Sequence, residues 1–387
     1  MGSNPDFRFA VISQGRLFVF EKGALTEVAS TFAEKMSERE RASFQRHAWK
    51  GQGNGFLPMW GKGQVEKEFR ETPKSVSSVA AVPGGGAFYT LQTTGVCALL
   101  KLNGEGSEDR IWHSNAAMVT DLAPHPDGSR VACVSLQENG TSRLALMRST
   151  GGGVQELTEG DSVDLCPSWV HDEPEKVVFQ SAGIGRSRDG FAQGMAPFEI
   201  HELDLTTGEM ETLAAGTRHD FLAPRYDAEG RLHFIRRPYR TAHSVNPLRW
   251  MLDVVLIPFR LLQAVFGWLN FFSMMWGGKP LKPGGAAKMD GEQMKKMLVW
   301  GSVIDAAREA KTQPGAEDPD LVPKTWELVR REKNGAESVI ARGVLSYDFL
   351  PSGGVLFSNG SAVFHRALDG AVTRVVKQGL IERVAAL

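Results

Sequence analysis

Short alternations of apolar and polar residues, separated by turn residues, fill most of the 387-residue chain. Alternation with a period of two is typical of half-buried β-strands, and the Gly, Asp and Asn residues between the runs favour tight turns. The clearest stretch is 118–157, which reads MVTDLAPHPDG, SRVACVSLQENG, SRLALMRSTGG and VQELTEG. This stretch predicts four antiparallel strands in about forty residues.

The same unit recurs along the chain. Further copies occupy 75–114, 162–216, 219–240 continued at 324–342, and 345–377. The five copies leave three strand-like runs at residues 7–30 and one at 380–387, and three strands plus one make a sixth unit. Four strands in about forty residues is the size of one β-propeller blade.

The prediction is therefore an all-β fold with residues 1–387 in a single domain, a six-bladed β-propeller. Its C-terminal strand closes the N-terminal blade. A ring built in this way has no free sheet edge to pair with other chains.

Turn residues sit at corresponding places in the copies, and glycine suits them because it adopts positive φ without strain. The best-formed turn is His125-Pro126-Asp127-Gly128, and Trp169 to Pro174 and Tyr226 to Gly230 follow it in part. This signature resembles the TolB-like (WD-like) propeller repeat, in which a strand ends in Trp/Phe-Ser-Pro-Asp-Gly. The resemblance covers most of the chain outside two long insertions. It implies a propeller but no particular function, because such repeats serve transport proteins, peptidase accessory domains and scaffolds.

All the long excursions are expected on one face of the propeller, where second strands turn into third strands and one blade connects to the next. They are a helix-loop insertion at 32–74, a loop at 181–197 and an insertion at 240–323 within the fifth blade. Long loops are often functional, so three on one face predict that this face binds a partner.

The insertion at 32–74 opens with Thr31 and has Glu34 three residues later, a capping box that predicts a helix as far as about Lys50. Gly51 would end this helix. A glycine-rich loop follows, and its apolar side chains could contact a partner or fold back over the propeller. These side chains are Phe56, Leu57, Met59 and Trp60.

The insertion at 240–323 is predicted to hold an amphipathic helix over 248–276 whose wide apolar arc must be covered by protein or lipid. The contact residues on this arc are Trp250, Val255, Leu262, Phe266, Trp268, Leu269, Phe272 and Trp276. A second helix is expected over 290–310. No second long apolar stretch exists to bring the chain back across a bilayer, so the sequence argues against a spanning helix.

A basic flank surrounds this apolar helix. Residues 236–296 contain ten Lys or Arg against three acids, whereas the whole chain has a net charge of −1. The flank residues singled out are Arg236, Arg237, Arg240, Lys279 and Lys282. Basic flanks with tryptophans favour an anionic membrane surface. A hydrophobic subunit, a second copy of the chain, or packing on the propeller itself are the alternatives.

No catalytic, phosphate-binding or metal-binding motif is present in the sequence, and the expectation is a protein that is not an enzyme and holds no cofactor or metal. The near-zero net charge gives no general attraction to nucleic acid. Three cysteines in apolar runs are expected to be buried thiols.

The sequence therefore predicts a cytoplasmic scaffold, with the inner face of the membrane as a peripheral location. Its loop-rich face docks a partner, and the apolar helix anchors it to a membrane surface or a hydrophobic subunit.

The alternative is an enzyme, or a small-ligand or metal binder, at the mouth of the central channel. The candidate side chains for that alternative are His113, His219, Asp121, Asp164, Asp220 and Asp348. Convergence of the carboxylates with His219 around a pocket would favour this alternative over docking.

Overall fold

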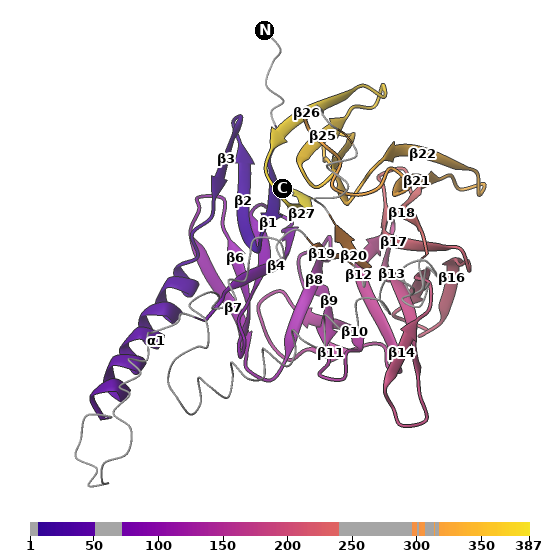
Figure 1. Cartoon of the computed structure of the whole chain (residues 1–387). Coiled ribbons are helices and arrows are strands. Elements are labelled where there is room, and N and C mark those ends of the chain that lie inside the picture. The colour runs from indigo at the N-terminus through magenta and orange to yellow at the C-terminus, as the bar shows by residue number, and fades with distance from the viewer. Residues whose placement is uncertain (1–6, 51–71, 240–295, 300–301, 306–312, 314–316) are drawn as a thin grey trace, which may run out of the picture. The chain divides into compact units, whose positions relative to one another are not determined.

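The computed structural model describes residues 7–50, 72–239, 296–299, 302–305, 313 and 317–387. Strands dominate these residues, which also contain the helix α1 (Thr31–Lys50) (Figure 1). The chain divides into two compact units. The first comprises 1–40, 71–239 and 304–387, and the second comprises 41–70 and 240–303. All the four-stranded groups described below belong to the first unit.

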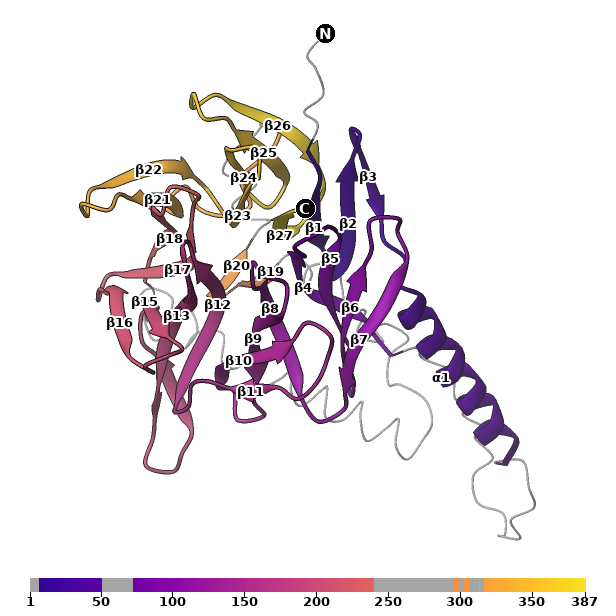
Figure 2. The same cartoon turned by 180° about the vertical axis from the view of Figure 1, so that it is seen from behind.

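The first sheet draws strands from both ends of the chain. Its order is β27 (Ile381–Ala386), β1 (Phe9–Ser13), β2 (Arg16–Glu21) and β3 (Ala24–Glu27). β27 pairs antiparallel with β1, from Phe9 opposite Ala386 to Ser13 opposite Ile381. This pairing was predicted from the strand count, and Figure 2 shows the two strands side by side.

Five more groups of four antiparallel strands follow the predicted repeats. The second sheet contains β4 (Ser75–Ala81), β5 (Ala87–Gln92), β6 (Cys97–Leu102) and β7 (Glu108–Ser114). The third group contains β8 (Met118–Pro124), β9 (Arg130–Leu136), β10 (Ser142–Arg148) and β11 (Gln155–Glu156). The fourth contains β12 (Ser162–Val170), β13 (Glu173–Arg186), β15 (Glu199–Asp204) and β16 (Met210–Ala214). One parallel bridge, Ser142 to Val163, joins these two groups into one sheet.

The remaining two sheets follow the same order along the chain. The fifth contains β17 (His219–Tyr226), β18 (Leu232–Pro238), β21 (Glu327–Arg331) and β22 (Glu337–Arg342). The sixth contains β23 (Ser346–Phe349), β24 (Val355–Ser358), β25 (Ala362–Arg366) and β26 (Val372–Lys377). The fifth sheet is therefore interrupted between β18 and β21, where the sequence predicted the long insertion.

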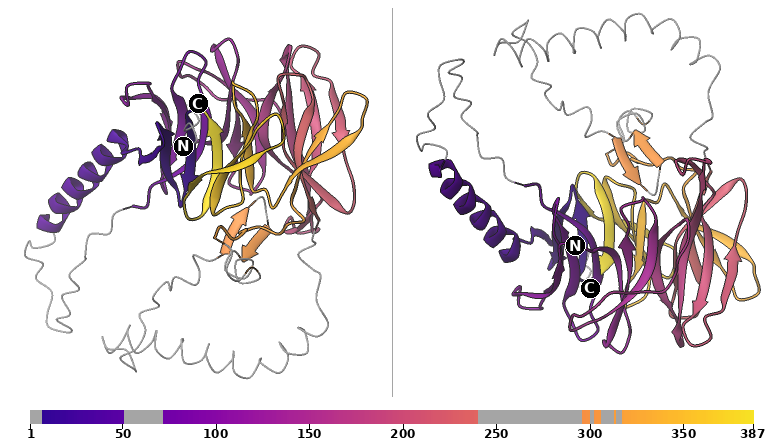
Figure 3. Two further views of the ribbon diagram at one scale, coloured as in Figure 1. Left: turned by 90° about the horizontal axis from the view of Figure 1, so that it is seen from above. Right: turned by 90° about the horizontal axis from the view of Figure 1, so that it is seen from below.

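Each of the six groups of four begins with one strand that lies beside the first strand of the next group. We call these six the inner strands: β4, β8, β12, β17, β23 and β27. Contacts join β4 to β8, β8 to β12, β12 to β17, β23 to β27, and β27 to β4. The hydroxyl of Tyr347 on β23 lies 2.7 Å from the carbonyl oxygen of Ala223 on β17. Figure 3 shows the sheets from two opposite sides.

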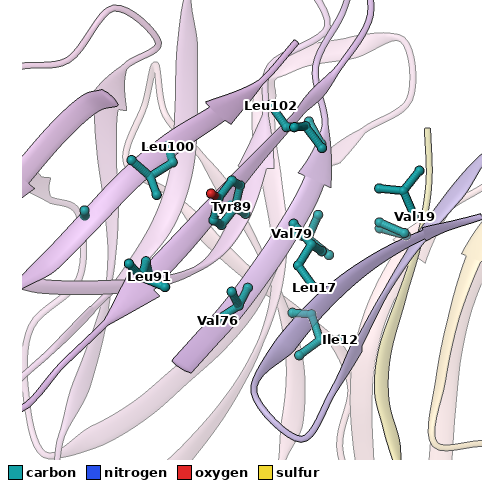
Figure 4. Close-up of a cluster of buried hydrophobic side chains, with 13 residues drawn as sticks. Ile12, Leu17, Val19, Val76, Val79, Tyr89, Leu91, Leu100 and Leu102 are labelled. Atoms are coloured by element: carbon teal, nitrogen blue, oxygen red, sulfur yellow. The ribbon is translucent and has the colours of Figure 1, made fainter. Parts of the chain in front are cut away.

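Successive sheets bury apolar faces against each other. Figure 4 shows the cluster between the first and second sheets, whose members come from alternate positions of their strands. They include Ile12, Leu17 and Val19 from the first sheet and Val76, Val79, Tyr89, Leu91, Leu100 and Leu102 from the second. Burying such side chains supplies the main driving force for this packing.

The predicted turn at 125–128 forms as the sequence suggested. Gly128 has φ 74°, and its N–H donates to the carbonyl of His125 at 2.8 Å. The Asp127 carboxylate accepts the N–H of Ser129 at 2.7 Å, and hydrogen bonds from Ser129 and His125 hold the pKa of Asp127 down at about 2. Gly230, with φ 72°, closes the corresponding turn of the fifth sheet.

The face on which the inner strands begin also carries the turns between second and third strands, and we call it the connection face. On β12, Ser162 pairs with Gly183 of β13, which then continues to Arg186 and pairs with β14 (Ala192–Met195). The predicted loop at 181–197 is thus an extended hairpin. Its Ser187–Phe191 turn lies beyond the first residue of β12, and the Arg186 guanidinium binds Asp161 at 2.7 Å.

The helix α1 has the predicted bounds, but its cap differs from the prediction. Ser30, not Thr31, caps the helix, since its hydroxyl accepts the N–H of Ala33 at 3.2 Å. The Glu108 carboxylate of β7 accepts the N–H of Phe32 at 2.9 Å and the Thr31 hydroxyl at 3.0 Å. Because Thr31 serves this longer-range contact, the capping position moves back by one residue.

The prediction of a second helix at 290–310, within the 240–323 insertion, is wrong for the residues that the structure describes. Residues Lys296–Val299 form β19 and Ser302–Asp305 form β20, and the two strands make a small sheet of their own. Val299, Val303 and Ile304 are β-branched and favour strands over helices. The predicted helix at 248–276 lies outside the described residues.

We expect the C-terminal strand to support the core. Ile381→Ala, at a fully buried position of β27, should lower the free energy of unfolding by about 2–5 kcal/mol in urea titrations. Val372→Ala, at a position of β26 with 52% exposure, is the control and should change it by less than about 0.5 kcal/mol. Equal effects of the two variants would show that β27 does not belong to the core.

We also expect Glu108 to hold the first turn of α1. Hydrogen bonds to charged groups contribute about 1.5–3 kcal/mol, so Glu108→Ala should speed hydrogen exchange at the Phe32 amide by about ten- to a hundredfold. Glu105→Ala, in the exposed turn before β7, should leave this rate unchanged. Unchanged exchange in Glu108→Ala would contradict the cap.

Candidate functional site

Most of the residues predicted to contact a membrane or partner lie outside the described residues. These are Phe56, Leu57, Met59 and Trp60 of the glycine-rich loop, the eight residues from Trp250 to Trp276, and Arg240, Lys279 and Lys282. None of the helical residues that the structure does describe forms a segment long and apolar enough to cross a membrane.

Two residues of the predicted basic flank are described, and both are engaged within the fifth sheet. Arg236 pairs with Glu327 and Glu337, each at 3.0 Å. Arg237 is buried, binds Asp220 at 2.7 Å and stacks on Trp326 with 4.8 Å to the ring centre. Burial lowers the pKa of Arg237 below its ordinary value, although Asp220 opposes this. These two arginines therefore stabilise the sheet and do not add free charge to a basic surface.

The connection face exposes apolar side chains on the propeller itself. Met118 at the start of β8 is 37% exposed and pairs with Leu136 at the end of β9, which is 36% exposed. Phe191, in the turn of the β13–β14 hairpin, is 73% exposed. Met210 and Leu368 are exposed at turns on the opposite face, so the projecting β13–β14 hairpin beside its apolar side chains is what distinguishes the connection face.

A second site is formed by five side chains of the inner strands, four of which are charged. Asp121 comes from β8, Cys166 from β12, Arg225 from β17, Asp348 from β23 and Arg383 from β27. Five inner strands thus each contribute one residue, and we call this set the central cluster.

Bulges in the inner strands help to place these residues. Asp121, Cys166 and Ala223 have φ of 50°, 52° and 50°, and each lies where the register with the second strand shifts. A bulge re-aims the side chains around it, and residues in this strained conformation often occur at functional sites. Arg225 and Arg383 are both adjacent to such shifts in their strands.

The first ion pair of the central cluster joins strands that are not neighbours. The Arg383 guanidinium of β27 donates to the Asp121 carboxylate of β8, although β4 lies between these two strands. The other Asp121 oxygen accepts the N–H of Cys166 at 2.9 Å. Burial alone would lower the pKa of Arg383, but the neighbouring acidic groups, with Asp121 first among them, together outweigh burial and the pKa is raised.

In the second ion pair the charged groups lie farther apart and the arginine side chain is more exposed. Arg225 lies 3.3 Å from Asp348, and its side chain is 36% exposed. The two Asp348 oxygens also accept the N–H groups of Phe349 at 2.9 Å and Ala386 at 3.0 Å. Burial lowers the pKa of Arg225, but the neighbouring acidic groups, with Asp348 first among them, together outweigh burial and the net change is upward. Both arginines therefore stay charged.

The cysteine prediction holds for two of the three residues. Cys97 and Cys133 are fully buried, whereas Cys166 is partly accessible and lies in the central cluster. Burial and the nearby Asp121 raise the pKa of the Cys166 thiol, and the charges of Arg383 and Arg225 partly offset this. The thiol is thus a neutral neighbour of two guanidinium groups.

The predicted candidates at the channel mouth separate into different places. Asp121 and Asp348 belong to the central cluster, while Asp164 accepts the Thr158 hydroxyl at 2.5 Å and the Ser181 hydroxyl at 2.6 Å. Asp220 pairs with Arg237 in the fifth sheet.

The two histidines of that prediction do not join the carboxylates. His113 lies on β7, the last strand of its sheet, and His219 is exposed at the start of β17. Across the described residues, no group of three His, Cys, Asp or Glu side chains has the arrangement of a metal site.

A cavity of about 480 Å³ opens between the fourth and fifth sheets, on the face opposite the connection face. Its charged residues mostly bind one another or their own sheet. Arg331 binds Glu337 at 2.7 Å, Glu332 binds Arg330 at 2.7 Å and Glu173 binds Lys176 at 2.5 Å. Three of the charged residues that line this cavity are therefore held by partners in their own sheets.

Comparison with known proteins places the fold. A structure of TolB from Acinetobacter baumannii matches 100% of this chain and 68% of its own, with a TM-score of 0.50 and 12% identity. The chain has the fold of the TolB-like β-propellers. A structure assigned as TolB from Agrobacterium tumefaciens matches 82% of this chain and 92% of its own, with a TM-score of 0.43 and 16% identity.

The propeller also resembles part of a prolyl endopeptidase structure, at 8% identity and a TM-score of 0.41. That match covers 97% of this chain but 42% of the peptidase chain. No protein-family model matches the sequence. No curated protein matches it either.

The sequence reasoning missed Arg225, Arg383 and Cys166 as members of the propeller's site. A weak signal was present, since Cys166-Pro167 and Ala223-Pro224 occupy similar places in their repeats. The contact from β27 to β8 depends on how the two ends of the chain meet, and no local pattern reveals it.

We expect the Arg383–Asp121 pair to stabilise the propeller. Removing one partner of a buried pair costs about 3–5 kcal/mol. Arg383 is 31% exposed, so water screens the pair and Arg383→Leu should cost about 2–3 kcal/mol in urea unfolding. Adding Asp121→Asn should recover most of this loss, because asparagine tolerates positive φ and still accepts the Cys166 N–H.

The surface variant Arg16→Leu is the control for this experiment. Arg16 is 66% exposed and lies 3.6 Å from Glu27, and such a pair contributes about 0–1 kcal/mol. If Arg383→Leu lowered the free energy of unfolding no more than Arg16→Leu does, the Arg383–Asp121 pair would not stabilise the propeller.

Proposed function

We propose that this chain is a non-catalytic binding protein, a six-bladed propeller that docks through its connection face. The sheet order, with β27 in the first sheet and contacts between successive inner strands, supports a closed ring of six blades. The observation that carries the docking proposal is that the projecting β13–β14 hairpin and the apolar side chains of Met118, Leu136 and Phe191 share the connection face.

The insertion at 240–323 leaves the fifth sheet on this same face, because β18 ends where β17 begins. Its sequence joins a wide apolar arc to basic residues and tryptophans. This combination fits an anionic membrane surface better than a neutral partner, because Lys and Arg near anionic lipids each add about 1 kcal/mol of attraction. The proposal therefore places a cytoplasmic propeller peripherally on the inner face of a membrane.

The test is co-sedimentation of the intact protein with vesicles that contain anionic lipid. We expect the intact protein to pellet and added salt to weaken binding. A variant with 245–310 replaced by a short Gly/Ser linker should stay in the supernatant. If neither pellets, and sizing shows a larger species for the intact protein alone, the insertion is a protein interface and the membrane proposal is wrong.

A matched pair of point variants tests the apolar arc without deleting the insertion. Phe272→Asp and Asn270→Asp add the same charge two residues apart, which on the predicted helix places them on opposite arcs, apolar and polar, at about 100° per residue. We expect Phe272→Asp to lower the bound fraction at least several-fold more than Asn270→Asp. Equal losses would indicate that charge alone governs binding.

A further inference from the structure

Among the residues that the structure describes, the two arginines of the central cluster meet partners for few of their donors. A guanidinium group offers five N–H donors in a planar fork. Within the described parts of the chain, Arg383 is recorded with one bond to Asp121, and Arg225 with one ion pair to Asp348 at 3.3 Å. Their side chains are 31% and 36% exposed, so solvent reaches the remaining donors.

The carboxylates of the cluster are, in contrast, nearly saturated. Asp121 is buried and binds Arg383 and the Cys166 N–H. Asp348 binds Arg225 and two backbone N–H groups. The groups that remain open to a ligand are therefore mainly donors with positive charge, and an incoming acceptor would meet few competing acceptors.

Geometry selects the class of ligand. Two arginines and two aspartates leave the cluster neutral, and a dianionic phosphate would double both the attraction to the arginines and the repulsion from Asp121 and Asp348. A planar carboxylate matches the fork of an arginine in two parallel hydrogen bonds.

We propose that Arg225 and Arg383 bind the carboxylate group of a ligand at the centre of the propeller. The proposal uses residues of the inner strands and none of the connection face or of the 240–323 insertion. The carboxylate belongs either to a small free acid or to the C-terminus of a peptide. Cys166 lies beside the bound group, and its charge depends on both arginines and Asp121.

Cys166 provides the probe for this site. The chain has three cysteines and the other two are fully buried, so alkylation of the folded protein reports on Cys166. Iodoacetate and iodoacetamide have nearly the same size, and both replace iodide by the cysteine thiolate to give a thioether, but iodoacetate alone carries a carboxylate. Both reagents need the same thiolate, so the ratio of their rates does not depend on the thiol pKa.

We expect the iodoacetate-to-iodoacetamide rate ratio at Cys166 to exceed that of free glutathione by at least tenfold. Sodium acetate should suppress the excess, whereas sodium chloride at equal ionic strength should not. Arg225→Gln should return the ratio to the glutathione value, and Arg225→Lys should retain part of it. A wild-type ratio equal to that of glutathione would overturn the proposal, as would an excess that acetate leaves unchanged.

Titration calorimetry measures ligand binding to the intact protein directly. It therefore tests the proposal even if the thiol is unreactive or a variant fails to fold. The probes are acetate, inorganic phosphate, Ala-Ala-Ala and its C-terminal amide. Saturable binding of acetate or the free peptide supports the site. Tighter binding of the free peptide with no binding of the amide identifies a peptide C-terminus, and equal binding of acetate and peptide identifies a small acid. Preference for phosphate, or no binding by any carboxylate, overturns the proposal.

Discussion

The antiparallel pairing of β27 with β1 is the constraint on which the rest of the propeller depends. It places the two ends of the chain in one sheet, with β27 as the inner strand between β23 and β4. Without this strand, β1 would present an unpaired edge, which proteins normally cover. The same strand carries Arg383 to Asp121 on β8, so the pairing also assembles the central cluster.

The connection face and the central cluster have different origins in the sequence. The first depends on residues added to the repeat, such as the extension of β13 and the segment that holds α1. The second depends on single residues beside bulges within the repeat. The two sites can therefore vary independently, because neither requires a change in the core between the sheets.

Much of the fold could be predicted because residues within each repeat specify its turns. Gly128 and Gly230 adopt positive φ in tight turns. The turns can be located from the sequence, and the neighbouring strands must end there. The cap of α1 is Ser30 and not the expected Thr31, because Thr31 binds the distant Glu108. The strand pair at 296–305 was taken for a helix because its apolar run is too short for periodicity to decide.

The site was less predictable than the fold. Asp121 and Asp348 could be named as inner-strand carboxylates, but Asp164 and Asp220 looked the same and instead bind hydroxyls and Arg237 within the sheets. Arg225 and Arg383 are adjacent only through tertiary structure, and a bulge cannot be read from one sequence. Local patterns identify strands and turns, whereas the meeting of side chains from five strands is a property of the assembled sheets.

The central claim is that the connection face is the docking face, and a fluorescent label tests it most directly. The label would be attached at Phe191→Cys on the connection face or at Leu368→Cys on the opposite face, where Leu368 is 80% exposed in the turn before β26. Both variants would carry Cys166→Ser. With anionic vesicles that contain a lipid-borne quencher, the account predicts strong quenching at position 191 and little at position 368. Equal quenching, or quenching at 368 alone, would contradict it.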